Sequence, residues 1–121
     1  MTDTVAPPQE IRVTPDRRTL VLVQAGGARQ DLSAEMLRVM SPSAEVQGHS
    51  PDQRKTVGGK IDVAISSVAP VGNYAVRIGF DDRHDTGIFS WSYLAELFRE
   101  KDTRWQAYLA ELDAKGLRRE R

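Results

Sequence analysis

The sequence predicts an α+β fold: a small, mostly antiparallel twisted β-sheet of about five strands, with one short helix after the first strands and two C-terminal helices. Two observations support this prediction. Apolar and polar residues alternate with a period of two in several stretches before Trp91, and the period changes to about 3.6 after it. Strands therefore come first and helices last, without the strand–helix alternation that is typical of a parallel sheet.

The N-terminal part predicts a hairpin. Residues 1–9 are polar and contain Pro7-Pro8, so we expect a flexible tail. Ile11 and Val13 alternate with polar residues and predict one strand, and Thr19–Val23 predicts a second, more deeply buried strand after a turn at Pro15-Asp16. Paired glycines after Ala25 predict the next turn.

A short helix is expected next, capped by Ser33 and ended by Ser41-Pro42. Residues 41–60 are rich in Ser, Gly and Pro with weak periodicity, and predict a long loop that is either mobile or functional. A β-meander follows, with strands over Ile61–Ile65, Tyr74–Phe80 and Thr86–Ser90, and with turns at residues 70–73 and 81–85.

Two helices complete the chain. The first begins after a cap at Ser90 or Ser92 and has Trp91, Leu94, Leu97 and Phe98 on one stripe. The second begins after a cap at Asp102 or Thr103, ends at Gly116, and carries Trp105, Tyr108, Leu109 and Leu112 on its apolar face. We expect the charged residues 117–121 to be frayed. The predicted organisation is a tail (1–9), a domain (10–98) and a helical extension (99–121).

Composition excludes several classes of function. The chain has 121 residues, with 17 Lys+Arg against 17 Asp+Glu, so it lacks the positive charge that binding to nucleic acid or to an anionic membrane surface requires. It has no cysteine, which excludes disulfides, thiolate metal sites and cysteine nucleophiles. The N-terminus has no basic or apolar segment typical of a secretory signal, and the longest apolar run is Leu20–Val23, so we expect a cytoplasmic protein. We also expect it to be a monomer or a weak homodimer.

Motifs for catalysis are weak. Gly58-Gly59-Lys60 has Arg54 at the first glycine position of a phosphate-binding loop and Ile61 after the lysine, so it predicts a turn instead. The serines have no Gly-x-Ser-x-Gly context, so no catalytic triad is indicated. A candidate site for iron or zinc is formed by His84, Asp82 and, from the preceding loop, His49. The alternative is that the aspartates of this turn bond only to local backbone.

Several segments resemble one family in the right order, over roughly residues 10–98. They are residues 37–39, 41–46, 70–76 and 80–91, and the most distinctive of them ends in Gly87-Ile88-Phe89-Ser90-Trp91. This pattern resembles the gamma-butyrobetaine hydroxylase-like N-terminal domain family, in particular its short stand-alone bacterial members. The hydroxylase reaction of the larger relatives belongs to a separate oxygenase domain, which nothing in this chain resembles.

The resemblance also implies a zinc site that this chain has lost. Eukaryotic relatives hold zinc through three cysteines and a later histidine, which correspond to Ser41, Ser43, Val46 and His84 here. Hydroxyls replace thiolates poorly and valine has no donor atom, so we expect no zinc, and iron stays the alternative cofactor. We expect hydrogen bonds from Ser41 or Ser43 to His84 to join the two segments instead. Arg83 stands where the family often has glycine.

Two functions follow as hypotheses. The first is a non-catalytic module that docks on a partner protein through the 41–60 loop and the His84 turn, with Ser41, Ser43, His49, Arg83 and His84 as the interaction surface. Because related domains are found joined to iron–sulfur carrier ATPases, the resemblance implies an accessory role in iron or cofactor metabolism. The alternative is a small metal- or ligand-binding protein that uses His84 with nearby carboxylates.

Overall fold

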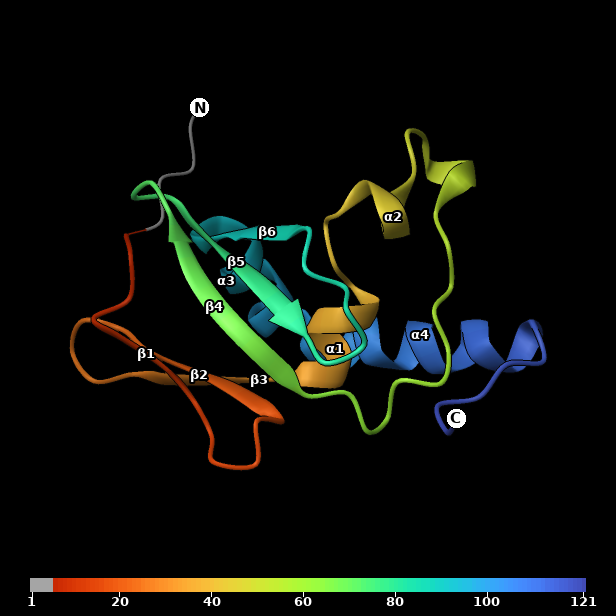
Figure 1. Cartoon of the computed structure of the whole chain (residues 1–121), viewed down its shortest axis with the longest axis horizontal. Helices are drawn as coiled ribbons and strands as arrows, with labels where there is room; N and C mark the ends of the chain where they lie inside the picture. Colours follow the sequence, from red (N-terminus) through yellow and green to blue (C-terminus); the bar gives the residue numbers. More distant parts are fainter. Residues whose placement is uncertain (1–5) are drawn as a thin grey trace.

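Two antiparallel sheets of three strands each form the β part of the molecule, as the computed structural model of residues 6–121 shows (Figure 1). The first sheet has the order β1 (Glu10–Val13), β2 (Thr19–Val23) and β3 (Arg29–Ser33), and the second has the order β4 (Ile65–Val71), β5 (Ala75–Phe80) and β6 (Gly87–Ser90). The α+β class is thus confirmed. The prediction of one sheet with about five strands is wrong, because six strands form two sheets.

Two reciprocal hydrogen bonds connect the sheets at one corner. The Ile65 amide donates to the Arg17 carbonyl at 2.7 Å, and Arg17 Nη1 donates to the Ile65 carbonyl at 2.9 Å. The turn between β1 and β2 is thereby fixed to the first residue of β4, and both sheets contribute to one core. Fully buried members of that core come from both sheets and from two helices, namely Leu20, Leu32, Leu37, Ile65, Ile78, Phe89, Leu94 and Leu97.

The predicted hairpin and the predicted meander are both present, with two errors in the strands. β3 was missed because only Leu32 is buried in it, so the strand has no alternating pattern. The strand predicted over Ile61–Ile65 begins only at Ile65, and Pro70 and Val71 belong to β4 rather than to the turn. Val63 is buried without being in a strand, which explains why the sequence alternates there.

Three short helices follow the first sheet. Helix α1 (Ala34–Val39) begins at the predicted Ser33 cap, whose Oγ accepts from the Met36 amide at 3.0 Å. The predicted long loop contains helix α2 (Ala44–Gln47) and a 3₁₀ turn, η1 (Pro51–Gln53). Figure 1 shows this segment projecting from the rest of the molecule before the chain returns to β4.

Helices α3 (Trp91–Arg99) and α4 (Lys101–Ala114) complete the fold. The Ser90 cap of α3 is confirmed, but α4 begins before the predicted Asp102 or Thr103 cap and has no side-chain cap bond. Gly116 ends α4 with φ of 66°, and the Leu117 amide donates to the Leu112 carbonyl at 2.8 Å, a pattern typical of a Schellman motif. Within residues 6–121, no helix combines the length and apolar character that a membrane span needs.

The C-terminal residues are anchored, which corrects the expectation that they fray. Arg119 donates two hydrogen bonds to the Glu35 carboxylate, at 2.8 and 2.9 Å, and the Glu35 side chain is only 7% exposed. The Gly59 amide also donates to the Arg118 carbonyl at 2.8 Å. Residues 1–5 of the predicted tail lie outside the described part of the chain.

Candidate functional site

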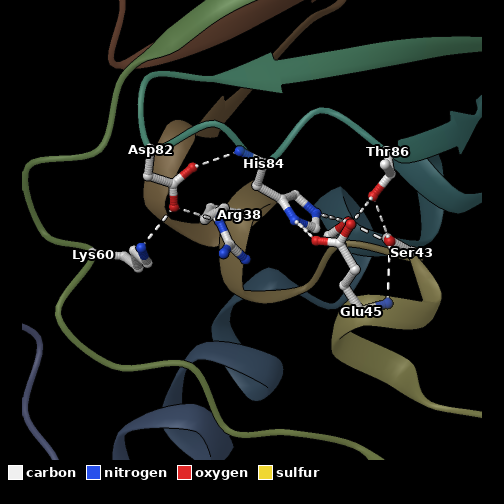
Figure 2. Close-up of polar contacts among 8 residues, drawn as sticks. Arg38, Ser43, Glu45, Lys60, Asp82, His84 and Thr86 are labelled. Atoms are coloured by element: carbon white, nitrogen blue, oxygen red, sulfur yellow. Dashed lines mark hydrogen bonds and ion pairs between the residues drawn. The ribbon is translucent and has the colours of Figure 1, made fainter.

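The turn between β5 and β6 places His84 against the segment that joins α1 to α2 (Figure 2). His84 Nε2 lies 2.9 Å from Ser41 Oγ, and His84 Nδ1 lies 3.0 Å from Glu45 Oε2. Thr86, two residues after His84, lies 2.7 Å from Ser43 and donates to Glu45 Oε1 at 3.1 Å. These five residues are called the His84 cluster below.

Local sequence explains why the two segments approach so closely. Ser43 is the cap of α2 and accepts from the Glu45 amide at 3.2 Å, which fixes the first turn of the helix, where Glu45 stands. Gly87 allows Ser41 to approach β6, because a Cβ at this position would lie 2.5 Å from Ser41 Oγ. Any larger residue at position 87 would therefore force the Ser41 hydroxyl out of its place beside His84.

The proton positions in the cluster follow from the partners. The Glu45 carboxylate accepts, so His84 Nδ1 donates to it, and Nε2 is left to accept from the Ser41 hydroxyl. Ser41 Oγ in turn accepts from the Ser43 amide at 3.2 Å. Every ring nitrogen and the Ser41 hydroxyl are thus satisfied within the protein.

This order of groups, hydroxyl to imidazole to carboxylate, is also that of a serine hydrolase triad. Ser41 is 0% exposed, however, and a nucleophile must come within bonding distance of a substrate atom. Two of its neighbours, Ser43 and His84, are buried as well. The cluster therefore connects two segments of the fold and presents no accessible nucleophile.

A second polar cluster lies beside the first and uses Asp82 (Figure 2). Its carboxylate bonds to Arg38 at 2.7 Å and to Lys60 at 2.6 Å, and it accepts from the His84 amide at 3.1 Å. Burial raises the pKa of Asp82, but the hydrogen bonds from Lys60, Arg38 and the His84 amide outweigh burial and lower it to about 2. Asp82 thus stays ionised and fixes the turn that carries His84.

The three residues predicted to bind metal do not come together. Asp82 is engaged by two cations, both ring nitrogens of His84 are bonded, and His49 is exposed on the segment after α2. Over residues 6–121, no group of three or more His, Asp or Glu side chains is arranged to hold a metal ion.

The positions implied for zinc do not fit that ion either. Ser41 and Ser43 supply hydroxyls that are already hydrogen-bonded, and Val46 is buried and has no donor atom. His84 alone cannot provide a tetrahedral site. The structure does bring Ser41 to His84, as the sequence hypothesis of a metal-free connection requires.

Three of the five residues predicted to form an interaction surface are buried: Ser41, Ser43 and His84. Only His49 and Arg83 are exposed. Because of their burial, these three side chains contribute little to the molecular surface.

Glu45 and Thr86 are cluster members that the sequence did not reveal. Both are exposed residues in segments without periodicity, so no pattern singled them out. Only the spacing Ser43-x-Glu45 at the start of a helix was a usable signal, since an N-cap serine orients the residues that follow it.

The chain is similar to one protein family and to several solved structures. A model of the family described as "Gamma-butyrobetaine hydroxylase-like, N-terminal" matches residues 11–95. A protein solved by NMR in solution is 44% identical, with 97% of this chain and 92% of that chain covered and a TM-score of 0.81. A second NMR structure is 40% identical, with 98% and 90% covered and a TM-score of 0.81.

A crystal structure gives a third similarity. The crystallised protein has unknown function, belongs to the DUF971 family and comes from Acidithiobacillus ferrooxidans ATCC 23270. It is 40% identical to this chain, the match covers 74% of this chain and 90% of that chain, and the TM-score is 0.61. No curated protein matches the sequence.

Proposed function

The chain belongs to the gamma-butyrobetaine hydroxylase-like N-terminal domain family, and from this premise we propose that it is a non-catalytic module that binds a partner protein. The binding surface is the segment of residues 48–55, called the recognition arm below. One observation carries the proposal: every side chain from Pro51 to Lys55 is exposed, although the backbone of the arm is held in place.

Hydrogen bonds fix both ends of the recognition arm. The Lys55 amide donates to the Val46 carbonyl at 2.7 Å, which closes the arm into a loop, and the His49 amide donates to Gln53 Oε1 at 2.8 Å. Arg54 pairs with Glu111 of α4. A loop that is ordered but buries little of its own side-chain surface is typical of recognition loops on a rigid scaffold.

The His84 cluster supports this role by positioning the base of the arm. Its bonds fix the start of α2, from which the arm continues, against the turn between β5 and β6. The cluster's buried hydroxyl argues against hydrolysis, and no segment of the chain resembles the oxygenase domain of the larger relatives.

The side chains of the arm favour a protein partner that carries both positive and negative charges. Asp52, Arg54 and Lys55 follow one another closely, and His49 and Gln53 add groups for directional hydrogen bonds. Such a mixed surface suits neither the phosphate backbone of nucleic acid nor an anionic membrane, both of which require an excess of cations.

Site-specific photo-cross-linking in cells that express the full chain tests the proposal. A cross-linker at Lys55 is compared with one at Arg12, an exposed position on β1. We expect a partner protein that is captured from Lys55 and not from Arg12. With the partner purified, Lys55→Glu should weaken its binding at least tenfold, whereas Arg12→Glu should not.

Capture of the same proteins from both positions, or binding unaffected by Lys55→Glu, would contradict the proposal. A cross-linked second copy of this chain would assign the arm to homodimerisation instead. The proposed link to iron or cofactor metabolism is tested by the partner itself, and a partner without iron, an iron–sulfur cluster or a related cofactor would contradict it.

A further inference from the structure

A cavity of about 400 Å³ lies where the end of α1 and helix α2 face helices α3 and α4. Its apolar wall is formed by Val39, Met40, Pro42 and Ala107. This volume falls in the range of roughly 300–1,000 Å³ that is typical of small-molecule sites. The cavity is separate from the buried His84 cluster, because it is lined by other residues.

Two tyrosines contribute ring faces to the cavity, because their hydroxyls are already used. Tyr93 Oη donates to the Met40 carbonyl at 2.5 Å, and Tyr108 Oη donates to the Val57 carbonyl at 2.6 Å. Burial raises the pKa of both hydroxyls, that of Tyr108 to about 12, so both stay neutral donors. A ligand therefore meets aromatic surface here and no free hydroxyl donor.

The charged donors that line the cavity are two guanidinium groups. Arg104 bonds to Glu100 through Nε and to Glu96 through Nη2, and Arg54 bonds to Glu111 through Nη2. No hydrogen bond within residues 6–121 uses Nη1 of either arginine. Both Glu111 oxygens are occupied, since Oε1 accepts from Thr56 at 2.5 Å and Oε2 accepts from Arg54.

We propose that this cavity binds a small organic carboxylate with an aromatic or aliphatic body. The body lies against Met40, Pro42 and the tyrosine rings, and the carboxylate accepts from Arg54 and Arg104 in charge-assisted bonds. A ligand cation is disfavoured over the Tyr93 ring, because Arg104 already lies there, 6.0 Å from the ring centroid. This inference does not rest on the proposed partner protein.

A titration followed by amide NMR tests the proposal on the full chain. The probe is 1-naphthylacetate, and 1-naphthylacetamide is the matched neutral probe of the same shape. We expect saturable shifts for the amides of Met40, Gln47 and Glu111, and an affinity for the carboxylate about tenfold higher than for the amide. Equal affinity for the two probes, or no saturation with the carboxylate, would overturn the proposal.

Two variants locate the binding. Ala107→Leu places a larger side chain in the cavity and should abolish the shifts, whereas Ala110→Leu, an exposed position on the same helix, should leave them unchanged. Arg54→Gln removes one guanidinium and should weaken carboxylate binding about tenfold without affecting the neutral amide. Unchanged binding in Ala107→Leu or in Arg54→Gln would show that the probe binds elsewhere.

Discussion

Replacement of His84 by alanine tests whether the His84 cluster holds the α1–α2 segment against the turn between β5 and β6. The variant loses the bonds to Ser41 at 2.9 Å and to Glu45 at 3.0 Å, and leaves a void at a residue that is 4% exposed. The bond to the buried Ser41 contributes about 1 kcal/mol, and the bond to Glu45 contributes less because that side chain is 60% exposed. With the void, we expect the free energy of unfolding to fall by about 2–3 kcal/mol.

Urea denaturation followed by the fluorescence of Trp91 and Trp105 measures this loss. For a domain of this size, it corresponds to a midpoint lower by about 1–2 M. The control is His49→Ala, which removes an exposed histidine and should change the free energy of unfolding by no more than about 0.5 kcal/mol.

A double-mutant cycle separates the hydrogen bond from the loss of packing. Ser41→Ala, His84→Ala and the double variant should give a coupling free energy of at least about 0.5 kcal/mol, because the two side chains are bonded to each other. A coupling of zero would refute the bond. A midpoint for His84→Ala equal to that of His49→Ala would refute the whole role assigned to the cluster.

Three further predictions concern charged residues. Asp82→Asn should lower the free energy of unfolding at neutral pH by about 1–2 kcal/mol. Because the pKa of Asp82 is lower in the folded state, its contribution to stability is present above the unfolded pKa of 3.8 and is lost as the pH falls toward about 2. Urea midpoints measured at several pH values would show this dependence. Arg83 has φ of 73°, so Arg83→Gly should relieve strain and raise the thermal midpoint by about 4 °C. Arg119→Ala should lower the free energy of unfolding by about 2 kcal/mol, because it leaves the buried Glu35 carboxylate unpaired, as urea denaturation would detect.

Each of these variants has a matched control. Asp85→Asn changes an exposed carboxyl of the same turn and should leave the acid sensitivity intact; equal pH profiles for the two variants would contradict the role of Asp82. Arg77→Gly in β5 should destabilise where Arg83→Gly stabilises, and two losses of similar size would argue against strain. Arg118→Ala changes an exposed neighbour of Arg119, and equal effects of the two alanines would contradict the Glu35 pair.

Strands could be predicted where apolar and polar residues alternate in the sequence, because this alternation indicates that one face of the strand is buried. β5 was predicted from its residues, since Val76, Ile78 and Phe80 are buried and Arg77 is exposed. β3 has one buried residue, so its place was set by pairing with β2, which a single sequence does not show. The start of β4 was set by the bonds between Ile65 and Arg17, which lie far apart in the chain.

The two-sheet arrangement and the fixed C-terminus were unpredictable for the same reason. Both depend on contacts between distant residues: Arg17 with Ile65, and Glu35 with Arg119. Arg119 stands in a run of charged residues that locally is typical of a solvated helix end. The charge that pairs with it, Glu35, lies on α1, is buried, and is reached by Arg119 from beyond the end of α4.

Part of the candidate site could be predicted from the sequence, and the rest depends on contacts between residues far apart in the chain. The proximity of Ser41 and His84 was expected from the resemblance, which implies that relatives hold one ion with residues at these positions. The hydrogen bonds that connect the two segments could not be predicted, because no motif describes the residues that make them. His84 Nδ1 bonds to Glu45 and His84 Nε2 bonds to Ser41. Thr86 bonds to both Ser43 and Glu45. A metal site would make the folding of this segment depend on an ion supplied from outside. Hydrogen bonds between residues of the chain remove that dependence, and the arm's position then rests on contacts that single substitutions can test.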